Sequence, residues 1–115
     1  YQTKNILFSQ TVPSYAPNAS DASKEYHMLL SRHAPNHKPS FASYETFLAA
    51  KTFTHALERI SGRLSRKKLL NVLTSKEGVD LGGVQVGYNP IHMHPHSYLY
   101  IYDQNSFHLI YERMF

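Results

Sequence analysis

The hydrophobic and polar positions follow a helical period in the middle of the chain and an alternating period near its two ends. Residues 5–12 open with an apolar run that stops at Pro13, which predicts a short β-strand. Asp21 can cap a helix that we expect to continue to about His33. The apolar residues of this helix share one face and are Ala22, Tyr26, Leu29 and Leu30.

The longest helix is predicted from about Ser43 to Ser61, and Gly62 stands where a left-handed residue would end it. A shorter helix is expected from its cap, Ser65, to about Lys76. The buried stripe of the long helix is expected to consist of Ala49, Phe53, Ala56, Leu57 and Ile60, and Tyr44, Phe47 and Leu48 extend its apolar surface at the start. In the short helix we expect Leu69, Val72 and Leu73 to be buried.

Alternation returns after Gly78. Residues 84–88 are predicted to form a strand that follows a tight turn at Gly82–Gly83. Residues 98–102 and 107–111 are expected to be the two arms of a β-hairpin. The fold class is therefore α/β, in the order strand, three helices and then strands. A single leading strand and three helices do not enclose a sheet by themselves, so this order is unusual for a self-contained domain.

The length and composition are those of one globular domain, with 115 residues, 42% hydrophobic and 17% charged. No apolar run reaches the roughly 18–20 residues that a membrane-spanning helix needs. Cysteine is absent, which excludes disulfide scaffolds, thiolate metal sites and cysteine nucleophiles.

The net charge of +4 is mild, but many of the basic residues lie in one stretch that contains no acid. Such a run is typical of a phosphate-binding patch in nucleic-acid-binding proteins. No aromatic residues are interleaved with it, as binding to single strands would require, so we expect a solvated surface and no nucleic-acid partner. The residues are Arg59, Arg63, Arg66, Lys67, Lys68 and Lys76.

Three histidines at alternate positions, His92, His94 and His96, are candidate metal ligands. In an extended segment such side chains stand roughly 6.5–7 Å apart, which is too far for three of them to reach one ion without a tight bend. No acidic residue is close enough in sequence to orient an imidazole. We therefore expect a polar loop and no metal, with a small metal-binding protein as an alternative.

No arrangement of residues indicates catalysis. The chain has no Gly-x-Ser-x-Gly motif and no carboxylates paired in sequence. Gly82–Gly83 lacks the spacing and the following helix of a phosphate-binding loop. The sequence therefore predicts neither an enzyme nor a cofactor.

Tyr44 and Glu45 are the candidate ligand-binding residues, because the start of a helix attracts anionic groups. An aromatic ring and a carboxylate could receive the apolar and ammonium parts of an amino acid. The alternative is structural: the helix dipole by itself favours Glu in a first turn, and Tyr44 would then belong to the core.

Several short motifs occur in a fixed order over nearly the whole chain. They are residues 6–13 (ILFSQTVP), 23–26 (SKEY), 39–50 (PSFASYETFLAA), 80–86 (DLGGVQV), and a histidine-containing turn before residues 98–100 (YLY). In this order and spacing the chain resembles the C-terminal part of the type I periplasmic solute-binding proteins. These are the leucine/isoleucine/valine-binding, or branched-chain amino-acid, receptors of ABC transporters.

The resemblance implies a receptor with two doubly wound α/β lobes that close on a small ligand, of which this chain would be about the last third. It implies a hinge near Pro13 and Tyr15 and places Tyr44 and Glu45 at the ligand cleft. The implied division is residues 1–12 as a strand of the second lobe, 13–19 as the hinge region, 20–88 as helices and strand of the first lobe, and 89–115 as the crossover and hairpin of the second lobe.

The function that the resemblance implies is capture of an amino acid or similar solute in the periplasm for a membrane permease. The groups that grip the ligand's amino and carboxyl ends would come largely from upstream segments. By itself this fragment is therefore expected to bind weakly and, because its sheet edges and apolar faces are incomplete, to self-associate. A self-associating interaction module without a ligand stays open as the alternative.

Overall fold

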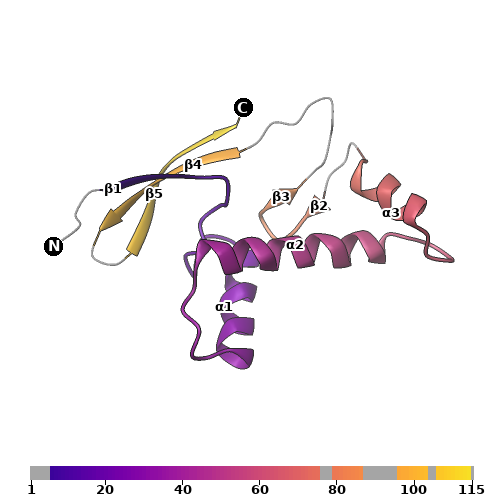
Figure 1. Ribbon diagram of the computed structural model, residues 1–115, viewed down its shortest axis with the longest axis horizontal. Coiled ribbons are helices and arrows are strands. Elements are labelled where there is room, and N and C mark those ends of the chain that lie inside the picture. Colours follow the sequence, from indigo (N-terminus) through magenta and orange to yellow (C-terminus); the bar gives the residue numbers. More distant parts are fainter. Residues whose placement is uncertain (1–5, 76–78, 87–95, 104–105, 115) are drawn as a thin grey trace. The chain divides into compact units, whose positions relative to one another are not determined.

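The structure is a computed structural model that describes residues 6–75, 79–86, 96–103 and 106–114. The described elements alternate from strand to helix and back to strand along the chain (Figure 1). By internal contacts the chain divides into two compact units, Tyr1–Ser14 with His94–Phe115, and Tyr15–Met93. The mixed helix and strand content predicted from the sequence is confirmed.

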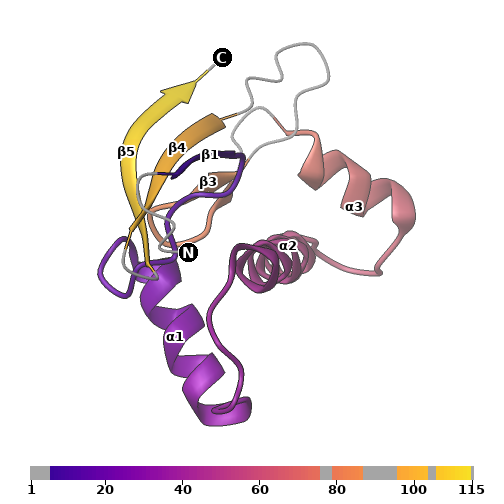
Figure 2. The same ribbon diagram turned by 60° about the vertical axis from the view of Figure 1, so that its left-hand side comes forward.

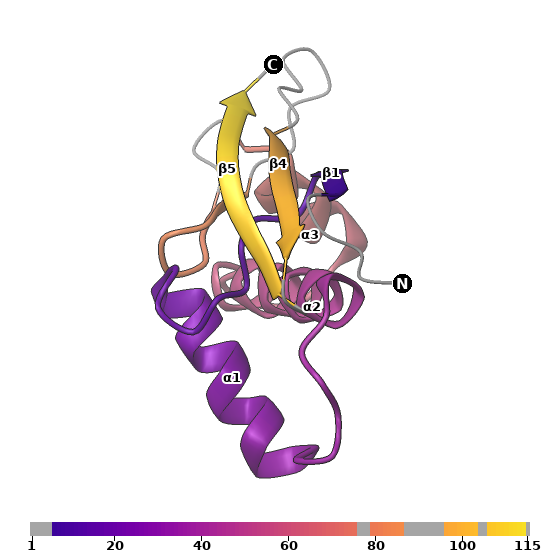
Figure 3. The same ribbon diagram turned by 90° about the vertical axis from the view of Figure 1, so that its left-hand side faces the viewer.

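The first unit contains a three-stranded antiparallel sheet in the order β1-β4-β5. Strand β4 (His96–Asp103) lies between β1 (Ile6–Gln10) and β5 (Ser106–Met114), as Figure 3 shows. The two hairpin arms are longer than the predicted 98–102 and 107–111, because the pairing runs from His96↔Met114 to Asp103↔Ser106. One irregularity interrupts the β4–β5 register, between Leu99 and Tyr100.

Tyr100 joins the beginning of the chain to its end. It is opposite Phe8 in the β1–β4 register, and only 1% of its surface is exposed. Its hydroxyl donates a hydrogen bond of 2.9 Å to the carbonyl oxygen of Val12, which is itself buried. The segment that follows β1 is therefore fixed to the sheet by a residue far away in sequence.

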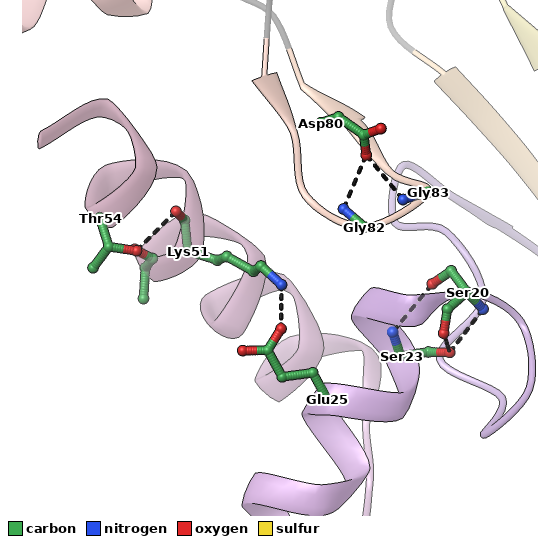
Figure 4. A network of polar contacts seen from close by, with 9 residues as sticks. Ser20, Ser23, Glu25, Lys51, Thr54, Asp80, Gly82 and Gly83 are labelled. Carbon is green, nitrogen blue, oxygen red and sulfur yellow. Dashed lines mark hydrogen bonds and ion pairs between the residues drawn. The ribbon is translucent and has the colours of Figure 1, made fainter. Parts of the chain in front are cut away.

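Helix α1 (Asp21–His33) has the predicted bounds, but Ser20 caps it and Asp21 is its first residue. The prediction that Asp21 is the cap is therefore wrong. The Ser20 hydroxyl accepts from the backbone N–H of Ser23 (3.1 Å), and the Ser23 hydroxyl accepts from the N–H of Ser20 (2.9 Å), as Figure 4 shows. This reciprocal capping box satisfies two N–H groups at the helix start.

Helix α2 (Phe41–Glu58) begins before the predicted Ser43, because Ser40 caps it by accepting from the Ser43 N–H (3.2 Å). It ends before the predicted Ser61. Gly62 has a φ of +76° but lies beyond the C-cap, Arg59, so its predicted role is wrong. Figure 2 views α2 nearly along its axis, beside α1.

The buried face of α2 is formed by Tyr44, Leu48 and Ala56. Phe53 was predicted to be buried and is 50% exposed. It follows Leu48 by five residues and therefore points about 140° away from it around the helix axis. Ala49 is exposed for a similar reason.

Helix α3 (Arg66–Leu73) is capped by Ser65, as predicted, whose hydroxyl accepts from the Lys68 N–H (3.2 Å). It ends at Leu73, before the predicted Lys76, which lies outside the described residues. Leu69, Val72 and Leu73 were expected to be buried and are only partly so.

Strands β2 (Val79–Asp80) and β3 (Gln85–Val86) pair antiparallel around the predicted glycine turn. Gly82 and Gly83 have φ of +98° and +83°, and their N–H groups both donate to Asp80 Oδ1 at 2.9 Å (Figure 4). The predicted strand 84–88 is seen only as β3, and its last two residues lie outside the described part of the chain. None of the described helices has the length and apolar character that crossing a bilayer requires.

Candidate functional site

The two candidate ligand-binding residues belong to the start of α2, where aromatic rings from three segments meet. Tyr15 lies 4.9 Å from Phe41 and 6.3 Å from Tyr44, measured between ring centroids. Tyr26, on α1, lies 5.0 Å from Tyr44 and 5.7 Å from Phe47. Most of these pairs are edge-to-face or tilted, the arrangement that aromatic quadrupoles favour. We call these five side chains the aromatic cluster.

Tyr26 connects the aromatic cluster to the cap of α2. Its hydroxyl shares a 2.5 Å hydrogen bond with Ser43 Oγ and accepts from the backbone N–H of Ser40 at 3.2 Å. The N–H of Ser43 is already capped by Ser40, so three polar groups of this helix end are satisfied within the protein. The start of α2 is therefore less available to an anionic ligand than the sequence suggested.

Tyr44 is fully buried in the aromatic cluster. This agrees with the alternative interpretation, in which Tyr44 belongs to the core. Within the described part of the chain its hydroxyl has no hydrogen-bond partner of regular geometry. Burial raises the pKa of the Tyr44 hydroxyl, a hydrogen-bonding contribution from the nearby Ser20 side chain lowers it, and the charge of Tyr26 raises it further. The phenol is therefore favoured in its neutral form, which can donate one hydrogen bond through its O–H group.

Glu45 is exposed, and the structure gives it no ion pair or hydrogen bond with any described residue. Because α2 begins at Phe41, Glu45 lies in the second turn of the helix and the first turn contains no acid. The helix dipole therefore does not explain its position. The two neighbours face different surroundings, since Tyr44 faces the core and the Glu45 carboxylate faces solvent.

Tyr15 and Pro13, the predicted hinge residues, lie on either side of the division between the two compact units. Tyr15 is fixed within its own unit: His27 Nε2 donates to its carbonyl oxygen at 2.5 Å, and its ring packs on Phe41. Burial, and secondarily Tyr26, raise the pKa of the Tyr15 hydroxyl. Pro13 is partly buried and directly follows the buried Val12.

An ion pair between Glu25 on α1 and Lys51 on α2 was not foreseen from the sequence (Figure 4). The Lys51 ammonium also lies 5.8 Å from the centroid of the Phe47 ring, at the limit of a cation–π contact. Glu25 and Lys51 stand on different predicted helices, so no periodicity relates them. The aromatic residues Phe41, Tyr44 and Phe47 are three residues apart in the sequence, and this spacing is the feature that could have indicated the cluster.

The structure describes only some residues of the two other candidate sites, the histidine cluster and the basic run. His92 and His94 lie outside the described residues, and His96 is known only as the first residue of β4. Among the described residues no group of histidines and acids is arranged to hold a metal ion. The basic run is exposed from Arg59 to Lys68 and lies around α3, while Lys76 is outside the described part.

Comparison of the chain with family models, curated proteins and solved structures finds no significant match.

Proposed function

We propose that this chain is part of the solute-binding component of an ABC transporter, a non-enzymatic receptor of the type I two-lobed fold. The observation that carries the proposal is the division into two compact units. Both terminal segments belong to one unit and residues 15–93 to the other. A receptor whose chain crosses between lobes requires this alternation, and the first change of unit falls inside the implied hinge region, 13–19.

In this receptor the ligand is an amino acid or a similar small solute, held between the lobes and delivered in the periplasm to a membrane permease. Closure is a hinge motion that the ligand stabilises through contacts with both lobes. Glu45 is the residue we propose for the ligand's ammonium group, because its carboxylate is exposed and has no partner among the described residues. Tyr44 is fully buried, so we propose a supporting role for it, in which its ring holds the start of α2 against α1 and does not contact the ligand.

Binding of amino acids, measured by isothermal titration, tests this proposal. The chain is titrated with a panel of amino acids, and the measurement is repeated on a longer chain that includes upstream sequence. We expect weak or no binding by the chain itself and clear binding by the longer one. A longer chain that ignores every amino acid and related small acid would contradict the proposed ligand class.

The Glu45→Gln variant of the longer chain tests the residue assignment. Loss of a charge-assisted hydrogen bond should weaken binding about tenfold or more. Glu58→Gln is the matched control, because Glu58 is an exposed acid at the opposite end of α2 and should leave the affinity unchanged. Equal effects of the two substitutions would remove Glu45 from the site.

A second candidate function, a self-associating module, is favoured by strand β1. This strand is at the edge of the described sheet, and its Ile6 and Leu7 side chains are 38% and 57% exposed. Uncharged edge strands with exposed apolar side chains readily pair with a second copy. Analytical ultracentrifugation tests this, and Leu7→Lys should shift any dimer toward monomer. A strictly monomeric chain at all concentrations would exclude this candidate.

A further inference from the structure

Leucines around α3 are exposed to an unusual degree for a globular protein. Leu64 is 60% and Leu70 58% exposed, and both are among the most exposed large apolar residues of the described chain. Leu69 and Leu73 are partly buried beside them. Three of the leucines and two basic residues of α3 line an open groove of about 500 Å³; they are Arg66, Lys67, Leu69, Leu70 and Leu73. The apolar lining of the groove therefore belongs to α3, and Leu64 lies two residues before the helix begins.

Positive charges without partners surround these leucines. Arg63, Arg66 and Lys67 are exposed, and no described residue forms an ion pair with them. Lys68 is engaged differently, because its Nζ donates to the carbonyl oxygen of Ser61 at 3.1 Å. The sequence from 59 to 76 contains no acidic residue that could neutralise the group. The local field is therefore positive, although the chain as a whole carries only +4.

We propose that Arg63, Leu64, Arg66, Lys67 and Leu70, which we call the leucine–base patch, bind an anionic lipid surface. The leucine side chains enter the boundary between headgroups and acyl chains, and the three bases contact lipid phosphates. This is how basic amphipathic helices lie on membranes. Each base near the surface contributes roughly fivefold to the partition coefficient, so three bases and two leucines are enough for reversible binding.

The lining of the groove favours a lipid surface over a protein or nucleic-acid partner. Among the described residues, its side chains are aliphatic or cationic, and no hydroxyl, amide or carboxylate group is present to fix the register of a peptide. Nor does an aromatic side chain line it, as stacking on nucleobases would require. An anionic bilayer needs only charge and apolar contact. The proposal is independent of the amino-acid receptor function, because it involves neither Glu45 nor the aromatic cluster.

Vesicle co-sedimentation tests the proposal, with vesicles of phosphatidylcholine alone and vesicles that also contain phosphatidylglycerol. We expect the chain to bind only the phosphatidylglycerol vesicles and to dissociate progressively as salt is added. The double variant Arg66→Glu/Lys67→Glu should bind at least about twentyfold more weakly. Arg32→Glu/Lys38→Glu changes the net charge equally at exposed positions away from the patch and should cost less than about threefold.

A second variant tests the apolar part. Leu64→Ser/Leu70→Ser keeps every charge and should weaken vesicle binding at least tenfold, with an unchanged circular dichroism spectrum as the check on folding. Equal losses in the patch and control charge variants would overturn the proposal, because binding would then follow net charge only. Absence of vesicle binding would also overturn it, as would binding to an acidic polypeptide or a DNA duplex that vesicles do not compete.

Discussion

Tyr26 and Tyr44 are neighbours in the aromatic cluster, yet their hydroxyls are in opposite situations. The Tyr26 hydroxyl is hydrogen-bonded to Ser43 and Ser40. The Tyr44 hydroxyl is buried near the Ser20 side chain and forms no hydrogen bond of regular geometry with the described residues. Both rings contribute apolar area that a phenylalanine would preserve. Replacing each tyrosine by phenylalanine therefore compares how much a hydrogen-bonded hydroxyl and a hydroxyl without a regular hydrogen bond contribute to the free energy of unfolding.

Tyr26→Phe should lower the free energy of unfolding by about 1–2 kcal/mol, because it leaves the Ser40 N–H without its acceptor. Tyr44→Phe removes an unpaired buried hydroxyl and should change stability by less than about 0.5 kcal/mol or increase it. Urea denaturation of both variants measures the difference. Equal destabilisation would mean that the Tyr44 hydroxyl has a partner in solution.

The raised pKa values of Tyr15 and Tyr44 predict a loss of stability in alkaline solution. In the unfolded chain both phenols ionise near pH 10.0, whereas in the folded chain burial holds them protonated to higher pH. The unfolded state therefore binds fewer protons above that pH, and the free energy of unfolding falls as pH rises through and beyond it. Urea titrations from neutral to alkaline pH should show this fall, and Tyr15→Phe/Tyr44→Phe should reduce its slope. An unchanged slope would assign the fall to other groups.

At the level of elements, the turn between β2 and β3 lies against the beginning of α1. The Gly82 carbonyl accepts from the Ala22 N–H at 2.9 Å, so the turn supplies an acceptor to the helix start in addition to the Ser20 capping box. A β-carbon at Gly82 would lie 3.0 Å from that same nitrogen. Glycine is required here for two reasons, the positive φ and the closeness of the helix backbone.

Gly82→Ala should therefore destabilise the protein by about 2–4 kcal/mol, which combines the cost of a left-handed alanine with a shift of the helix start. Gly62→Ala is the matched control, because Gly62 also has a positive φ but its nearest neighbour would be the flexible Lys68 side chain at 3.6 Å. That control should cost only about 1–2 kcal/mol. Thermal and urea unfolding compare the two, and equal losses would show that the contact with α1 contributes nothing.

The bounds of α1 and the cap of α3 could be predicted because capping and apolar period act over a few residues. The choice of Ser20 over Asp21 could not, because it depends on Ser23 returning the hydrogen bond. The exposure of Phe53 and the burial of Tyr44 depend on which face of α2 meets its neighbours, which a helical period leaves open. The Glu25–Lys51 pair likewise arises only when α1 and α2 come together.

For the whole molecule, the pairing of β1 with β4 joins residues that are about ninety positions apart, and no local pattern predicts it. The hairpin predicted from the sequence accounts for β5 as one neighbour of β4, whereas the other neighbour, β1, lies at the beginning of the chain. The division of the chain follows from this pairing, since it gathers both terminal segments into one unit and leaves residues 15–93 as the other. Each unit then has buried residues of its own, Val12 and Tyr100 in one and Tyr26 and Tyr44 of the aromatic cluster in the other.

Separate cores predict separate opening reactions in native-state hydrogen exchange. Tyr26→Phe weakens only the unit that contains the aromatic cluster, so protection should fall for amides of α1 and α2 by about five- to thirtyfold. Amides of β4 bonded to β1, such as those near Tyr100, should exchange at the original rate, because their contacts lie in the other unit. Tyr100→Phe is the reciprocal variant: it removes the bond to Val12 and should lower protection in the sheet while leaving α1 and α2 unchanged. If either substitution lowered protection equally in both sets of amides, the two units would unfold as one cooperative body and the prediction of separate opening reactions would be wrong.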